Sequence, residues 1–145
     1  PGMPRGFYYL SPMEFEFDSE TVTIRYETMD IVRTFAVDGH PAPDGAPHTP
    51  NGYSTAHWEG DALIVDTTHL AAGETTREGF PKSAEMTLQE FFYVEVQDDA
   101  PHLFVSVTVT DPQNFARPYT TVNEFVLEPD WELLPFDCNT VEYDQ

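Results

Sequence analysis

The stretch His-Trp-Glu-Gly-Asp-Ala-Leu-Ile-Val-Asp-Thr at 57–67 constrains the fold more than any other part of the chain. Gly60 tolerates the positive φ that the first central position of a type II′ turn requires, so Gly60-Asp61 predicts a two-residue hairpin turn. This turn places Trp58 opposite Leu63, whereas a shift by one residue places Trp58 opposite Asp61 and buries the ring less well. We therefore predict a β-hairpin with Trp58 and Leu63 on its inward face.

Apolar and polar residues alternate along most of the chain, which is typical of half-buried β-strands. The pattern predicts strands at residues 13–17, 22–26, 31–37, 53–59, 62–69, 84–96, 103–109, 122–126 and 131–136. No segment has a convincing helical period. Eight or nine strands joined as sequential neighbours indicate an all-β antiparallel meander. Closure into a lipocalin-like barrel, which leaves no exposed edges, is the simplest arrangement, and a β-sandwich is the alternative.

A length of 145 residues fits a single domain with a real core. Residues 1–12 contain three prolines, two glycines and three aromatic residues, and they predict an extended N-terminal arm before a single β-barrel domain at 13–145. Residues 38–51 contain four prolines and two glycines, which exclude regular structure. A loop of this length is often a binding loop, so we expect residues 38–53 to form a partial lid.

The charge balance excludes several kinds of partner. The chain has 26 acidic and six basic residues, a formal net charge of -20. Such a surface repels phosphate backbones and anionic lipids, and no stretch approaches the roughly 18 apolar residues of a membrane span. We therefore predict no nucleic-acid partner and no membrane insertion. Hydrophobic residues make up 40% of the chain, too many for a disordered acidic polypeptide, so the acidic residues form a solvated coat on a folded body.

Two features bear on processing and redox state. The chain begins at Pro1 rather than at Met, which is compatible with a processed or truncated product. Cys138 is the only cysteine, so no internal disulfide is possible. Its thiol is either free and semi-buried, or forms a disulfide with another chain, or has lost a partner cysteine that lay upstream of Pro1.

Several short motifs together suggest a family. They are Pro-Gly-Met-Pro-Arg at 1–5, Val-Asp-Gly at 37–39, Trp-Glu-Gly-Asp-Ala-Leu-Ile-Val-Asp-Thr at 58–67, Asp-Pro at 111–112 and the late Cys138. In this combination the chain resembles a family of exported bacterial proteins to which no activity is assigned. The resemblance covers nearly the whole chain and implies a secreted or periplasmic β-rich domain.

Polar residues that interrupt apolar strand faces are the main candidates for chemistry, because a buried charge is costly unless it is paired. Arg33, Glu90 and Glu124 are the three that qualify. If Val96 opposes Leu103 across the turn at 98–101, Glu90 lies opposite an apolar residue, Val109. One hypothesis is a buried arginine–carboxylate network that sets strand register. The other is a polar cluster in a cavity, in which Arg33 orients an anion or a carboxylate and Glu90 or Glu124 acts as acid or base.

Aromatic residues on the predicted strands suggest a binding cavity, because the interior of an eight-stranded barrel holds one small ligand. We expect these side chains to bind it: Trp58, Phe35, Phe92, Tyr26 and Trp131.

The five histidines lack the spacing that places two metal ligands on one face. His40 and His48 share the proline-rich loop, and if this loop folds back they come within reach of His57 or His69. A metal site formed by these histidines is therefore kept as an alternative. We otherwise predict no metal and no cofactor. No nucleophile elbow and no glycine-rich phosphate loop is present.

Three functions follow from these features. The first is binding of a small apolar or aromatic molecule in a β-barrel cavity. The second is a cofactor-free isomerase, cyclase or hydrolase that uses a cavity carboxylate. The third is a structural or assembly subunit that forms homo-oligomers by docking residues 1–12 onto a neighbouring chain.

Overall fold

A computed structural model describes residues 2–4, 11–75 and 79–136 and is all-β, with antiparallel sheets as predicted. The first sheet consists of β1 (Met13–Phe17), β2 (Thr21–Tyr26) and β3 (Ile31–Ala36). The second has the order β10-β9-β8-β5-β4 and consists of β4 (Tyr53–Glu59), β5 (Ala62–Thr68), β8 (Thr87–Gln97), β9 (Ala100–Thr110) and β10 (Tyr119–Val126). A two-stranded ribbon of β6 (Gly73–Glu74) and β7 (Pro81–Lys82) lies between β5 and β8 in sequence. The helical element in this part of the chain is a short 3₁₀-helix, η1 (Thr28–Asp30).

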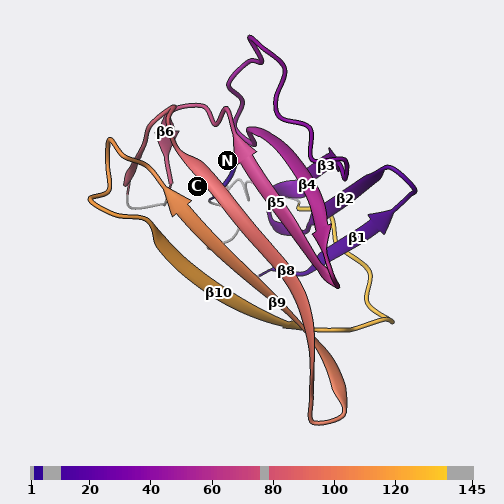
Figure 1. Ribbon diagram of the computed structural model, residues 1–145. Helices are drawn as coiled ribbons and strands as arrows, with labels where there is room; N and C mark the ends of the chain where they lie inside the picture. The colour runs from indigo at the N-terminus through magenta and orange to yellow at the C-terminus, as the bar shows by residue number, and fades with distance from the viewer. Residues whose placement is uncertain (1, 5–10, 76–78, 137–145) are drawn as a thin grey trace, which may run out of the picture.

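The two larger sheets pack face to face at one end of the molecule (Figure 1). β8, β9 and β10 are long twisted strands, and the β8–β9 hairpin extends past the smaller sheet. No hydrogen-bonded ladder joins the two larger sheets in the described part of the chain. The connections β1-β2-β3, β4-β5 and β8-β9-β10 join sequence neighbours, as a meander requires.

The predicted register of the β4–β5 hairpin is confirmed. Trp58 lies opposite Leu63, Ala56 lies opposite Val65, and the strands are connected by two residues. Gly60 has a φ of 61°, which a residue without a Cβ adopts at little cost.

The predicted register of the next long hairpin is wrong by two residues. Val96 lies opposite Pro101 rather than Leu103, and Glu90 lies opposite Val107. The reason is that Asp98 and Asp99 both have positive φ, 49° and 63°, and form a two-residue turn of the I′ kind instead of the expected longer one. A shift of two residues preserves the side-chain alternation, so Glu90 still faces inward.

The strand predicted at 131–136 is absent, and this stretch has no regular structure. Two of its backbone N–H groups bind side chains instead of a neighbouring strand: Leu134 N donates to Glu27 Oε2 at 3.0 Å, and Phe136 N donates to Asp30 Oδ1 at 2.9 Å. The segment after β10 therefore reaches the turn that follows β2.

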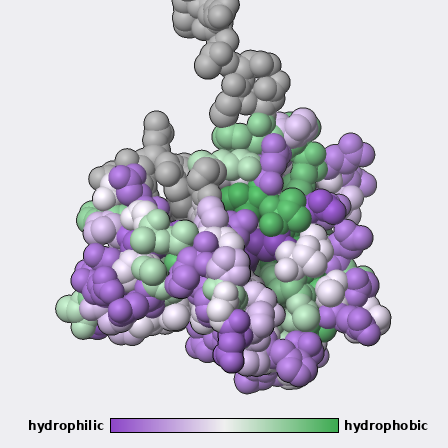
Figure 2. Space-filling model, turned by 90° about the horizontal axis from the view of Figure 1, so that it is seen from above, coloured by the Kyte–Doolittle hydropathy of each residue, from purple (hydrophilic) through white to green (hydrophobic). Residues whose placement is uncertain are grey.

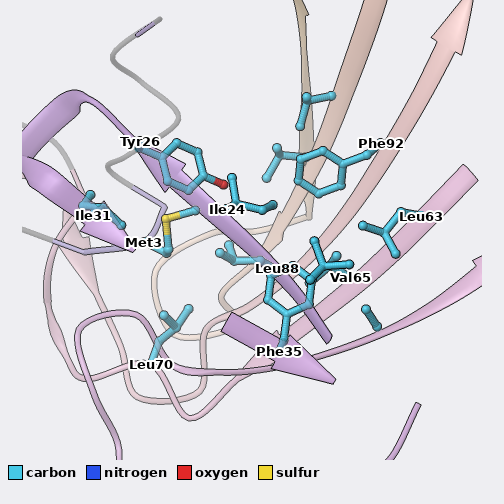
Figure 3. Packing of buried hydrophobic residues seen from close by; sticks show 14 of the residues in the cluster. Met3, Ile24, Tyr26, Ile31, Phe35, Leu63, Val65, Leu70, Leu88 and Phe92 are labelled. Carbon is cyan, nitrogen blue, oxygen red and sulfur yellow. The ribbon is translucent and has the colours of Figure 1, made fainter. Parts of the chain in front are cut away.

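The core lies between the two larger sheets (Figure 3). Leu88, Phe92 and Val65 of the larger sheet face Ile24 and Phe35 of the smaller one, and all are at most 4% exposed. β-Branched and aromatic side chains at alternate positions supply both inner faces, which explains why these segments form strands.

Part of the N-terminal arm packs into this same core. Met3 is fully buried, its N–H donates to Pro50 O at 3.0 Å, and its carbonyl accepts a hydrogen bond from Lys82 Nζ at 2.9 Å. A Cβ on Gly2 would lie 2.3 Å from Pro50 O, so only glycine fits there. Residues 1 and 5–10 of the arm, like Cys138, lie outside the described residues.

The surface reflects the acidic composition. Hydrophilic side chains cover most of the face shown in Figure 2, and hydrophobic ones gather in one area of it. The described residues contain no helix that is long and apolar enough to cross a membrane.

Asp111 holds the loop between β9 and β10 against the segment that precedes β8. Its carboxylate accepts hydrogen bonds from Ser83 Oγ at 2.6 Å, Ser83 N at 2.8 Å, Asn114 Nδ2 at 2.9 Å and Gln113 N at 3.2 Å. Burial alone acts to raise the pKa of Asp111, but these donors reverse the effect and hold the pKa below its usual value of 3.8.

Replacing Asp111 with Asn should lower the free energy of unfolding by about 1–3 kcal/mol at neutral pH, because an amide presents N–H groups to donors that need an acceptor. The folded-state pKa of Asp111 is lower than its unfolded-state pKa, so the charged carboxylate stabilises the fold above pH 3.8. That contribution is lost as the pH falls from 3.8 through the lower folded-state pKa. Urea unfolding at stepwise lower pH should therefore show the difference between the two proteins shrinking. A constant difference would contradict this role.

Candidate functional site

A buried ion pair lies between the two larger sheets. Arg33 is the central inward residue of β3, between Ile31 and Phe35, and Glu90 is an inward residue of β8, the middle strand of the larger sheet. The guanidinium binds the carboxylate through two parallel hydrogen bonds, NH1 to Oε1 at 2.8 Å and NH2 to Oε2 at 2.7 Å. The side chains are 2% and 0% exposed. The pair therefore links the two sheets with the strongest geometry open to an arginine and a carboxylate.

Three hydroxyl groups also belong to this network. Arg33 NH1 donates to Tyr26 Oη at 3.3 Å, and Arg33 NH2 donates to Ser54 Oγ at 3.0 Å and to Thr67 Oγ1 at 3.1 Å. Thr67 Oγ1 also donates to Glu90 Oε2 at 3.3 Å and lies 2.8 Å from Ser54 Oγ. Strands β2, β3, β4, β5 and β8 thus each contribute one polar group at one level of the interior.

Burial and charge shift the pKa of two members of the network. Burial acts to lower the pKa of Arg33, but the Glu90 carboxylate outweighs it and leaves that pKa raised. Burial raises the pKa of Tyr26 to about 12, against an opposing effect of the Arg33 guanidinium. At neutral pH the arginine is therefore charged and the phenol protonated.

Glu124, the third residue predicted for this cluster, is on the other face of the larger sheet. It lies opposite Phe104, and its Oε1 is 2.7 Å from His102 Nδ1. The inward positions of β10 include Asn123 and Phe125, so the prediction that Glu124 shares a face with Glu90 is wrong. The error arose because Val122 and Val126, which suggested an apolar inner face, are both more than half exposed.

Arg33 and Glu90 have the geometry of a buried arginine–carboxylate network, the first of the two hypotheses drawn from the sequence. Both carboxylate oxygens accept hydrogen bonds from Arg33, and neither side chain reaches the surface. An acid–base role for Glu90 requires access for a substrate, whereas the Glu90 side chain is fully buried.

The aromatic residues predicted to bind a ligand lie in three different places. Tyr26, Phe35 and Phe92 are each at most 4% exposed and belong to the core, and the Phe35 ring centroid lies 5.6 Å from Arg33 Cζ. Trp58, at the end of β4, is 50% exposed. Trp131 is 71% exposed and follows β10.

Four aromatic rings form a continuous row from the core to the surface, which we name the aromatic rim: Phe92, Phe15, Phe17 and Trp58. Phe92 contacts Phe15 edge to face with ring centroids 5.8 Å apart, and Phe15 stacks on Phe17 at 6.0 Å. Phe17 then contacts Trp58 at 6.3 Å. Phe17 and Trp58 are 56% and 50% exposed, so the outer half of the rim faces solvent while its inner end is part of the core.

The histidines are distributed over several elements. His48 and His69 approach each other, with ring centroids 5.2 Å apart, and His48 Nδ1 lies 2.9 Å from Leu70 O. His40 pairs with Asp38 instead. Within the described ranges, no group of three or more His, Cys, Asp or Glu side chains has an arrangement that suits a metal ion.

Ser54 and Thr67 are network members that the sequence did not single out. They lie opposite each other in the β4–β5 hairpin. The alternation that places Ala56 and Val65 inward also places these two hydroxyl groups inward, so the hairpin register contained the signal that was missed.

Comparison of the chain with protein-family models, with curated proteins and with solved structures gave no match. Membership of the exported bacterial family therefore stays a prediction from the sequence motifs.

Proposed function

We propose that the protein binds a small, uncharged apolar or aromatic molecule at the aromatic rim. The observation that carries the proposal is the unbroken series of ring contacts from Phe92 through Phe15 to Phe17 and Trp58, with the last two half exposed. A bound aromatic ring stacks on a row of rings that the core already holds in place. The entropic cost of ordering side chains on binding is therefore small.

The net charge narrows the class of ligand. At a formal charge of -20 the protein repels anions over distances of about one Debye length, roughly 10 Å at 0.1 M salt. A neutral ligand that gains from ring stacking and burial is not opposed by this field. The field of the protein therefore opposes a carboxylate or a phosphate as the ligand.

We also propose that the two larger sheets are the walls of an incompletely closed, lipocalin-like barrel rather than the layers of a sandwich. In support, β3 approaches β4 closely enough for Arg33 to reach Ser54, and Gly39 N donates to Ala56 O at 2.9 Å. On the other side the segment after β10 spans the distance to Glu27 through Leu134. In such a barrel the aromatic rim lies at an open end.

The part of the predicted lid loop around Thr49 lies away from the aromatic rim, at the start of β4. Thr49 N donates to His69 O at 2.9 Å, and Ala71 N donates to Thr49 O at 2.7 Å, near the start of β4. Trp58 is near the other end of this strand. The proposed ligand site therefore does not include this part of the loop.

Two predictions about the environment of the protein are kept as proposals. A secreted or periplasmic location rests on the sequence motifs. Homo-oligomer formation through residues 1–12 rests on the aromatic residues of the arm, whereas Met3 of the same arm is buried in the core of its own chain.

Binding of N-phenyl-1-naphthylamine, an uncharged aromatic probe that fluoresces in apolar sites, tests the proposed function. Trp58→Ala should weaken binding by about 2- to 12-fold, because one aromatic contact contributes about 0.5–1.5 kcal/mol. A fluorescence titration gives the dissociation constant of each protein.

Trp131→Ala is the matched control, since it removes the other tryptophan, which is also exposed. Its dissociation constant should equal that of the unchanged protein. If both substitutions weaken binding equally, or if neither weakens it, the probe binds elsewhere and the proposal is overturned.

A further inference from the structure

His48 and His69 project from two segments that the backbone holds side by side. Thr49 and Leu70 form a short parallel bridge, in which Thr49 N donates to His69 O at 2.9 Å and Ala71 N donates to Thr49 O at 2.7 Å. The centroids of the two imidazole rings lie 5.2 Å apart, with an angle of 42° between the ring planes. Main-chain hydrogen bonds therefore fix the two segments that bring these rings together.

The backbone of His69 is in an unusual conformation. Its φ is 53°, in the left-handed region that a residue with a Cβ enters only at a cost. Such a conformation persists where surrounding contacts hold it, and here the carbonyl of His69 is bound by Thr49 N. His69 comes directly after β5, and in this conformation its ring lies next to that of His48.

The hydrogen bonds of the two rings leave one nitrogen of each for a ligand. His48 Nδ1 lies 2.9 Å from Leu70 O, and because a carbonyl only accepts, Nδ1 carries the proton and Nε2 of the neutral ring has the lone pair. His69 Nδ1 lies 2.9 Å from Thr68 Oγ1, a hydroxyl oxygen that can accept from Nδ1–H in the same way. Within the described ranges, the Nε2 atom of neither ring has a hydrogen-bond partner.

We propose that His48 and His69 bind one divalent transition-metal ion through their Nε2 atoms, with Cu²⁺ as the preferred ion. A metal-binding histidine usually donates its other N–H to a carbonyl or carboxylate, which is the arrangement of His48. At a metal–nitrogen distance of about 2.0–2.1 Å, two imidazoles on one tetrahedral ion have ring centroids roughly 5 Å apart, as these two have. His48 is exposed and His69 partly exposed, so water completes the coordination.

The class of ion follows from the ligands and from the charge of the protein. Imidazole nitrogen suits Cu²⁺, Ni²⁺ and Zn²⁺, whereas Ca²⁺ and Mg²⁺ prefer oxygen ligands. Of these transition-metal ions Cu²⁺ binds a given nitrogen site most tightly. A formal net charge of -20 attracts cations to the surface. The site is near the start of β4, and it is therefore independent of the ligand proposed at the aromatic rim.

Binding of Cu²⁺ to the intact protein tests the proposal. One equivalent of Cu²⁺ is added in an excess of Mg²⁺, which competes for the carboxylates of the acidic coat. Electron spin echo envelope modulation detects the remote nitrogen of each imidazole on Cu²⁺ and so counts the bound rings, and titration calorimetry gives the dissociation constant. We expect two imidazoles on the ion. A single imidazole, or none, would overturn the proposal.

His48→Asn and His69→Asn each remove one proposed ligand and keep an amide near the position of Nδ1. Asn also tolerates the positive φ at residue 69. Each variant should keep one bound imidazole and raise the dissociation constant at least about tenfold, because loss of a group that only orients a ligand already costs about 10–100-fold.

His40→Asn is the matched control, because His40 belongs to the same loop as His48 but pairs with Asp38. It should change neither the number of bound imidazoles nor the dissociation constant. An equal effect of His40→Asn, or two imidazoles retained after either of the other substitutions, would overturn the assignment of the two ligands.

Discussion

Glu90→Gln should lower the free energy of unfolding by about 3–5 kcal/mol, because it leaves the buried charge of Arg33 without its partner. The amide has nearly the volume of the carboxylate, so the loss is electrostatic and not a packing defect. Against a typical total stability of about 5–15 kcal/mol, this single change is severe. Urea unfolding followed by circular dichroism, with linear extrapolation to water, gives the value.

A double-mutant cycle separates the ion pair from its surroundings. Arg33→Met combined with Glu90→Leu removes both charges, so the double variant should lose less stability than the sum of the two single changes, by about 2–3 kcal/mol. Glu95→Gln, at an exposed position of the same strand, is the matched control and should change stability by no more than about 0.5 kcal/mol. Additive losses in the cycle would show that Arg33 and Glu90 do not depend on each other.

Met3→Ala should destabilise the protein by about 2–5 kcal/mol. The side chain is fully buried between the loop at Pro50 and the core, and its removal leaves a cavity. Thermal and urea unfolding both report the loss.

Met13→Ala is the control for this substitution, because Met13 is only partly buried at the start of β1. The smaller loss expected there reflects the smaller apolar area withdrawn from water. If Met3→Ala has no greater effect than Met13→Ala, the first residues of the arm do not anchor the fold in solution.

Much of the strand pattern was readable from the sequence because it depends on local alternation. The segments 13–17 and 53–59 match β1 and β4 to the residue. The register of the β4–β5 hairpin followed from one glycine, since a two-residue turn determines every pair along the two strands. The inward direction of Arg33 and Glu90 followed from the same alternation.

The errors about Glu124 and about the strand predicted at 131–136 have different physical causes. On β10 the apolar residues Val122 and Val126 face solvent, so the alternation of apolar residues identified the outer face of this strand instead of the inner one. The segment at Trp131 contains apolar residues but its backbone binds Glu27 and Asp30, which no local pattern reveals.

The candidate sites depended on contacts between distant segments. The pairing of Arg33 with Glu90 joins residues 57 positions apart, and either could instead have met another charge.

The open order of the five-stranded sheet has a consequence for how copies of the chain behave toward one another. β10 is an end strand of this sheet in the described part of the chain, and its Val122 and Val126 side chains are exposed. Apolar side chains exposed along the edge of a sheet favour unwanted pairing between molecules. The long-range repulsion between chains of charge -20 counters that tendency, so the acidic coat protects the edge in dilute buffer and does so less well as salt screens it.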